Sequence, residues 1–166
     1  MTFDDHNRVG AAHAEKCVLV GEVVRSFGMV RLRVTGSSML PAVWPGDTLI
    51  ILCRNSNELR PGDMLLYCRE GRLVVHRVVS RSASRGQLGI AVRGDSLSTQ
   101  EDLVHPSEIF GTVSGIVRNG KYIEPISRLK YHQRLIGVFT SHSNSLARLV
   151  IFIHSICSAA WWREAL

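Results

Sequence analysis

The chain has 166 residues and a mass of 18.5 kDa, which suits one compact domain with a full hydrophobic core and is too short for two. Hydrophobic residues make up 45% of the chain and charged residues 20%, a composition that excludes wholesale disorder. No uncharged apolar stretch reaches the length of about 18 residues that a transmembrane helix needs, and Met1–Arg8 is acidic and polar. The sequence therefore predicts neither a full transmembrane helix nor a secretory signal peptide.

The net charge of +6 is concentrated toward the C-terminus, because seven cationic residues and only two acidic ones follow Phe110. An arginine-rich C-terminal segment suits an anionic membrane surface, although a solvated basic tail has the same composition. We expect no nucleic-acid partner.

The four cysteines form no Cys-x-x-Cys pair, and no Cys/His cluster has the spacing of a zinc site. We therefore expect no metal, no cofactor and no structural disulfide. Cys53 and Cys68 lie inside apolar runs and are predicted to be small core residues.

The N-terminal part predicts a helix over His13–Phe27, because apolar residues recur near helical spacing and Gly28 follows as a stop signal. Val30–Thr35 alternates apolar and basic residues, which is typical of a half-buried strand. A loop rich in glycine, serine and proline follows over Gly36–Gly46.

The rest of the body has the pattern of short strands joined by tight turns, two of them Pro-Gly-Asp and one Asn-Gly. The fold class is therefore predicted as mainly β, a sandwich or partly open barrel with a short N-terminal helix (1–29), a body (30–126) and a helical C-terminal tail (127–166). The further predicted strands are Thr48–Cys53, Met64–Cys68, Leu73–Val79, Gln87–Arg93, Ile109–Val117 and Tyr122–Ile123.

The glycine-flexed loop that leaves the first strand is the best candidate for chemistry. Such a loop can expose the hydroxyl of Ser38 together with backbone N–H groups, the pairing that acyl transfer needs. Its residues Gly36-Ser37-Ser38-Met39-Leu40-Pro41, followed by Gly46-Asp47, are also compatible with an ordinary surface loop.

Gly-x-Ser-Met-x-Pro followed by Gly-Asp resembles the nucleophile box of the signal peptidase I and self-cleaving repressor superfamily, the S24/S26 serine peptidases. The resemblance implies a small β domain of that kind, with Ser38 as the nucleophile. It also implies an oxyanion hole that includes the backbone N–H of Ser38, with the hydroxyls of Ser37 and Thr35 as further candidates.

One histidine, His76, interrupts the apolar strand Leu73–Val79 and by alternation shares the core-facing side with Val74 and Val78. Taken alone, it fits a structural core histidine. Val75-His76-Arg77-Val78, however, resembles the general-base box, in which the archaeal and endoplasmic-reticulum signal peptidases have histidine where bacterial ones have lysine.

No lysine lies between Lys16 and Lys121, so this region has no Ser-Lys dyad. The resemblance to the histidine type implies His76 as the general base, with activity rising through a pKa near that of histidine, roughly 6 to 7.5. The other six histidines are predicted to be non-catalytic.

Arg93-Gly94-Asp95, followed by Glu101-Asp102, is similar to the acid box of the histidine-type enzymes. Asp95 matches the Gly-Asp position, whereas Asp102 lies near the later acid and Glu101 is equally close. We favour Asp102 as the acid that orients His76, with Asp95 structural or secondary; Asp95 as a simple turn cap is the alternative.

The resemblance spans roughly Val30–Arg118, without the family's N-terminal anchor or the large β insertion of the bacterial enzymes. Three functions compete: a serine endopeptidase that cleaves precursor, signal or leader peptides, a self-cleaving regulator of the repressor branch, and a non-enzymatic binder. The Ala-Gly or Cys-Gly bond that repressors cleave is missing. The joint presence of Ser38, His76 and the two acids favours the peptidase and a peptide or preprotein substrate.

The C-terminal tail contains a stretch of fourteen residues without formal charge, Leu149–Trp162, between Arg148 and Arg163. A helix of that length spans roughly 21 Å, short of the ~30 Å hydrocarbon core of a bilayer. Its tryptophan pair favours the membrane–water interface, which predicts a peripheral membrane anchor and a membrane-associated or cytoplasmic protein. Packing of this segment on the body, or a dimer contact, is the alternative.

Overall fold

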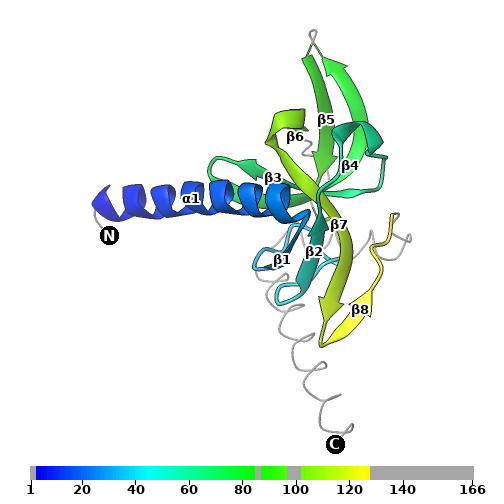
Figure 1. Cartoon of the computed structure of the whole chain (residues 1–166), viewed down its shortest axis with the longest axis horizontal. Helices are drawn as coiled ribbons and strands as arrows, with labels where there is room; N and C mark the ends of the chain where they lie inside the picture. The colour runs from blue at the N-terminus through cyan, green and yellow to red at the C-terminus, as the bar shows by residue number, and fades with distance from the viewer. Residues whose placement is uncertain (1–2, 85–86, 97–101, 128–166) are drawn as a thin grey trace, which may run out of the picture.

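The computed structural model describes residues 3–84, 87–96 and 102–127. Over these residues the protein is mainly β, with one antiparallel sheet of eight strands and one α-helix (Figure 1). The elements are α1 (Phe3–Phe27), β1 (Met29–Arg33), β2 (Thr48–Leu52), β3 (Met64–Arg69), β4 (Arg72–Ser84), β5 (Gln87–Arg93), β6 (Asp102–Val104), β7 (Ile109–Arg118) and β8 (Lys121–Ile123), with 3₁₀ turns at Ser56–Glu58 and Pro106–Glu108.

The strands follow the order β1-β2-β7-β3-β4-β5-β6, and β8 pairs with β7. Every pairing between neighbours is antiparallel, so β1 and β4, four steps apart, run in the same direction. In the described part of the chain β1 has no partner on its outer edge, and β5 pairs with β4 only from Arg77 onward. The segment Arg72–His76 therefore also has an edge without a strand partner.

Strand β3 is the centre of the fold because four consecutive residues, Met64–Tyr67, are buried on both faces of the sheet. Met64 and Leu66 belong to a first core, and Leu65 and Tyr67 belong to a second core on the other face. The first core comprises Val20, Val24, Met39, Val43, Leu49, Ile51, Met64, Leu66, Val113 and Ile116. The second comprises Leu59, Leu65, Tyr67, Val78, Ile90, Val92 and Val104.

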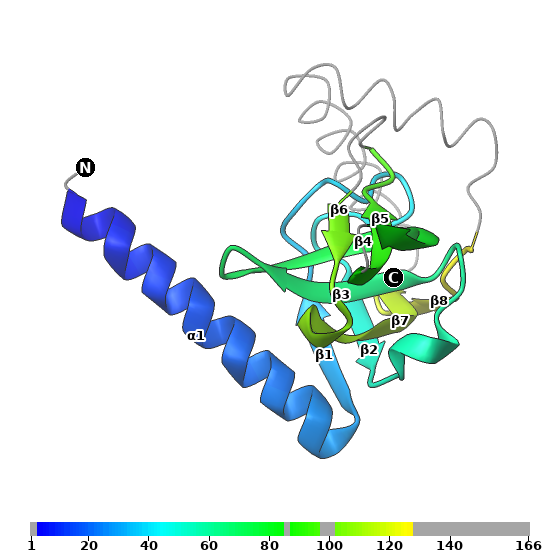
Figure 2. The ribbon, with the colours of Figure 1, turned by 90° about the horizontal axis from the view of Figure 1, so that it is seen from above.

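The helix α1 covers the first core with Val20 and Val24, and its N-terminal turns project beyond the sheet (Figure 2). It ends where predicted: Gly28 adopts a positive φ of 72° and its N–H donates to Val24 O at 2.9 Å. It begins at Phe3, ten residues before the predicted start. The early turns lack an apolar stripe, so hydrophobic periodicity could not reveal them.

The predicted strands are present, with β4 extended to Ser84, and the short strand β6 was not predicted. The prediction that Cys53 is a core residue is wrong, because it follows the last residue of β2 and is exposed; Cys68 is half-buried. Glu101 and the tail segment Leu149–Trp162 lie outside the described residues. In the part that is described, no helix has the length and apolar character needed to cross a membrane.

The two Pro-Gly-Asp turns share a motif but differ in their surroundings. Asp47 is buried, and its carboxylate accepts from the Trp44 N–H at 2.8 Å and from Nε and Nη2 of Arg118 at 2.9 and 2.7 Å. Asp63 accepts from the Arg60 N–H at 2.8 Å in an exposed position. Only the first turn is therefore fastened to β7 by an ion pair.

We predict that Asp47→Asn lowers the free energy of unfolding by about 3 kcal/mol, because it leaves the Arg118 guanidinium without its countercharge in a largely buried site. Asp63→Asn is the matched control and should cost less than about 1 kcal/mol, since an amide oxygen can still accept the turn hydrogen bond. Urea unfolding of both variants tests this. Equal losses would contradict the structural role given to the Asp47–Arg118 pair.

Candidate active site

The loop that carries Ser38 is closed at its base and anchored at its tip. Val34 and Asp47 close the base, with the Val34 N–H donating to Asp47 O at 2.8 Å. The turn that follows Ser38 is packed into the protein, because Met39, Leu40 and Val43 are buried. Ser38 precedes these anchors and is only partly buried, so packing on one side fixes a residue that solvent still reaches on the other.

The backbone around Ser38 is also fixed by Ser96, which follows β5. The Ser96 N–H donates to Ser38 O at 2.9 Å, and Ser96 Oγ donates to Ser37 O at 3.1 Å. Among the described residues, neither the N–H nor the hydroxyl of Ser38 has a hydrogen-bond partner. A free hydroxyl beside a free backbone donor is the arrangement that a serine nucleophile and its oxyanion hole require.

His76 lies buried in β4, with 6% of its surface exposed. It pairs with Leu65 in the register of β3 and β4, and Val74 and Val78 pack with the second core, so the predicted facing of the strand is confirmed. Its Nδ1 lies 3.0 Å from the hydroxyl of Tyr67. The imidazole is thus held inside the sheet by a side chain from the neighbouring strand.

Tyr67 connects His76 to Asp102, the first residue of β6. The Tyr67 hydroxyl donates to Asp102 Oδ2 at 3.2 Å, and that oxygen lies 3.7 Å from His76 Nδ1. A hydroxyl has one proton, so if Tyr67 donates it to the carboxylate it accepts from Nδ1–H of the imidazole. This arrangement places the proton of neutral His76 on Nδ1 and leaves Nε2 as the basic nitrogen.

Burial lowers the pKa of His76 from its ordinary value of 6.5, and the charges of Asp102 and Asp95 oppose that shift without cancelling it. Burial also raises the pKa of Tyr67, and the neighbouring carboxylate of Asp102 raises it further. At neutral pH the site therefore holds a neutral imidazole and a protonated phenol. A neutral imidazole is the form that can accept a proton.

Asp95 is engaged elsewhere, in an ion pair with Arg77. Arg77 Nε and Nη2 donate to the two carboxylate oxygens at 2.8 and 2.7 Å, and Nη1 donates to Gly62 O at 2.8 Å. The Asp95 side chain is only 4% exposed. The geometry thus gives Asp95 a structural contact and places Asp102 next to the imidazole, while Glu101 lies outside the described residues.

Ser38 and His76 are not in direct contact. They are connected through a series of intervening residues. Ser38 is hydrogen-bonded to Ser96, Ser96 follows Asp95, and Asp95 is paired with Arg77, the residue after His76. Within residues 3–84, 87–96 and 102–127, no hydrogen bond joins the Ser38 hydroxyl to the imidazole. Among the described residues, the imidazole contacts Tyr67 and Asp102, and the structure gives no contact between it and Ser38.

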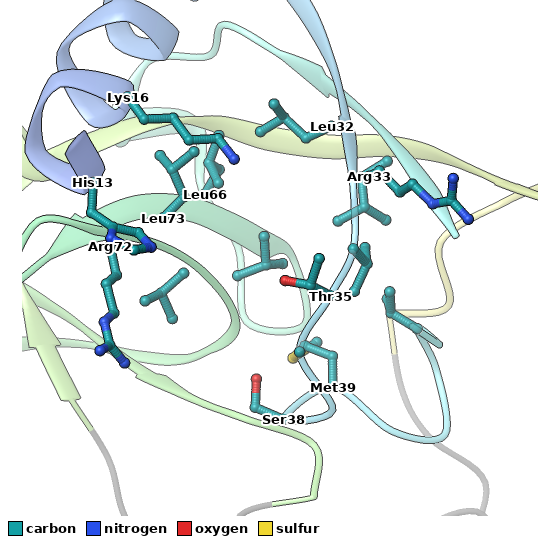
Figure 3. A pocket seen from close by; sticks show the side chains of 16 residues that line it. His13, Lys16, Leu32, Arg33, Thr35, Ser38, Met39, Leu66, Arg72 and Leu73 are labelled. Carbon is teal, nitrogen blue, oxygen red and sulfur yellow. The ribbon is translucent and has the colours of Figure 1, made fainter. Parts of the chain in front are cut away.

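A groove with a cavity volume of about 600 Å³ lies beside Ser38, between α1, β1 and the start of β4 (Figure 3). Pockets that bind small or peptide ligands commonly have this size. Ser38 lies at one end of it in this view and Lys16 at the other, with Thr35 between them. The floor is apolar and consists of Leu32, Val34, Met39, Val43, Leu49, Leu66, Leu73, Val74 and Val75.

Two residues of this site, Tyr67 and Ser96, were not predicted as functional. A tyrosine inside the apolar run Met64–Cys68 was the available signal, because a buried phenol needs a hydrogen-bond partner. Ser96 follows the Gly94-Asp95 pair, and nothing in the sequence indicates that it reaches the backbone of Ser38.

The described residues contain no group of His, Cys, Asp and Glu side chains that could hold a metal ion. Neither the scan of protein-family models nor the search of curated proteins finds a match to this chain. The assignment of a function therefore rests on the motifs and on this geometry.

We predict that the His76 imidazole titrates below pH 6.5 and that Asp102→Asn lowers its pKa further, because the carboxylate is the strongest group that favours the imidazolium. NMR titration of the histidine ring protons measures both values, with His76→Gln identifying the resonance. A wild-type pKa above 6.5, or a rise in Asp102→Asn, would disprove the burial and the contact described here.

Proposed function

We propose that the protein is a serine endopeptidase of the signal peptidase I type, with histidine in place of lysine as the general base, that cleaves precursor or leader peptides. The observation that carries this proposal is the hydrogen-bonded series His76–Tyr67–Asp102. A histidine kept neutral, with Nδ1 bonded and Nε2 available, is what a general base for serine requires. The carboxylate of Asp102 also lies close enough to Nδ1 to stabilise the imidazolium that such a base forms.

In the proposed reaction, Nε2 of His76 takes the proton of the Ser38 hydroxyl while Oγ attacks the carbonyl carbon of the scissile bond. The N–H of Ser38 donates to the oxyanion that forms. The imidazolium gives its proton to the leaving amine as the peptide C–N bond breaks, which leaves an acyl-serine. Water, deprotonated by the same imidazole, then hydrolyses the ester and restores Ser38.

Asp102 acts in this scheme through Tyr67. When His76 becomes cationic, the Nδ1–H bond to the Tyr67 oxygen strengthens, and the phenol in turn donates to the Asp102 carboxylate. The negative charge 3.7 Å from Nδ1 stabilises the imidazolium directly as well.

The antiparallel sheet with a core on each face supports a finer proposal about the fold, the partly open barrel or sandwich of the signal-peptidase and repressor β domain. We also propose that the C-terminal tail binds an anionic membrane surface peripherally. This binding would bring the site close to membrane-bound precursors.

The substrate is proposed to bind as an extended strand in the groove beside Ser38. In the described part of the chain, the outer edge of β1 and the Arg72–His76 segment of β4 lack a strand partner. Residues of both, Leu32–Arg33 and Arg72–Val75, line the groove. These edges offer backbone donors and acceptors to a peptide, and the apolar floor offers contacts for alternate side chains. Ser38 then meets one peptide bond at the end of the groove.

We predict that the full-length protein cleaves peptides in a proteome-derived library and that Ser38→Ala reduces cleavage by at least on the order of a thousandfold. Ser80→Ala is the matched control, since Ser80 is an exposed serine on the same strand as His76. Mass spectrometry of new peptide termini gives the rates. Cleavage by Ser38→Ala at the wild-type rate would end the peptidase proposal, and absence of cleavage by the wild type would favour a non-enzymatic binder.

We predict that a cleaved peptide loses at least about tenfold in kcat/KM when backbone N–H groups in its groove-binding part are N-methylated, because strand pairing is lost. Small residues should be preferred next to the cut. Peptides that are locked as helices and cut equally well, or large charged residues favoured beside the scissile bond, would contradict strand binding.

A further inference from the structure

Among the described residues, four basic ones and no acidic one line the groove beside Ser38. The basic residues are His13 and Lys16 from α1, Arg33 from β1 and Arg72 from β4. They come from three different elements, so positive charge surrounds the groove rather than following one strand (Figure 3).

Three of these side chains have no countercharge among the described residues. The side chains of Lys16, Arg33 and Arg72 have neither an ion-pair nor a hydrogen-bond partner there, and all three residues are exposed. Arg77 and Arg118, by contrast, are each paired with a buried aspartate. Unpaired cations around a groove with an apolar floor concentrate positive potential there and attract an anionic ligand.

The charge lies away from the reacting group. In Figure 3 Lys16 is at the end of the groove opposite Ser38, and His13 and Arg72 lie on the side formed by α1 and β4. An extended peptide whose scissile bond lies at Ser38 therefore reaches Lys16 with residues away from the cut, because it runs along the groove. Charge recognition there is compatible with small residues at the cut.

We infer that the groove selects peptides with acidic side chains, Asp or Glu, in the segment that lies along Lys16 and Arg72, away from the scissile bond. This inference names the substrate class of the proposed peptidase and rests on that proposal for the identity of the groove.

A peptide fits the groove better than a nucleic acid does. None of the described lining residues is a Phe, Tyr or Trp, whereas proteins that bind single-stranded nucleic acids combine positive charge with such aromatic groups, on which bases stack. The groove instead offers two strand edges and an apolar floor, which suit a backbone with alternating side chains.

The test measures binding rather than cleavage, with full-length Ser38→Ala so that the peptide remains intact. Fluorescence anisotropy compares decapeptides that carry a small-residue centre and two Asp residues, moved stepwise along the peptide, with isosteric Asn peptides. We expect the Asp peptides to bind roughly tenfold more tightly at low ionic strength when the Asp residues lie away from the centre, with the preference weakened by salt.

Charge reversal assigns the effect to the groove. Lys16→Glu combined with Arg72→Glu should abolish the preference for Asp and create one for Lys, whereas Arg54→Glu, an exposed arginine that does not line the groove, should leave it unchanged. Equal binding of Asp and Asn peptides, an equal effect of Arg54→Glu, or tighter binding of a single-stranded oligonucleotide that depends on Lys16 and Arg72 would overturn the inference. Because Ser38→Ala does not cleave, a failure of the peptidase proposal shows in the library experiment and leaves this binding result to be judged separately.

Discussion

The arrangement of the site depends on one requirement, that a histidine buried in the sheet must have its Nδ1 hydrogen-bonded. Tyr67 meets this requirement because the pairing of β3 with β4 places it diagonally from His76 on the same face. The phenol in turn needs an acceptor, and the pairing of β5 with β6, with Val92 opposite Asp102, brings the carboxylate there. Sheet register therefore determines both the tautomer of the imidazole and the acid that acts on it.

Two arginine–aspartate ion pairs hold the loops next to strands β4 and β7 in place. Arg118 with Asp47 fastens the end of the Ser38 loop to β7, and Arg77 with Asp95 fastens the segment after β5 to β4. Paired, hydrogen-bonded charges of this kind are costly to break and so restrict the positions that a loop can adopt. Ser96, beside the second pair, transmits that restriction to the backbone of Ser38.

Local signals in the sequence were sufficient for every strand except the short β6. Alternation gave the facing of His76, and the glycine-rich box indicated Ser38. The role of Tyr67 could not be predicted, because it depends on the register between strands that no local pattern reveals. The choice between Asp95 and Asp102 depends likewise on Arg77, whose side chain engages the first acid. The prediction that Cys53 is a core residue was wrong, because an apolar run in the sequence can extend past the last buried residue of a strand.

The most direct test of the account is the pH dependence of kcat/KM for one peptide identified as a substrate, because this parameter reports ionisations of the free enzyme. The account predicts that activity rises with pH through a single ionisation below pH 6.5, that this value equals the pKa of His76 measured by NMR, and that Asp102→Asn moves both values down together. An inflection at about 8 or above, the range of a lysine base, or an acidic limb that does not move with the pKa of His76, would contradict a mechanism in which His76 activates Ser38.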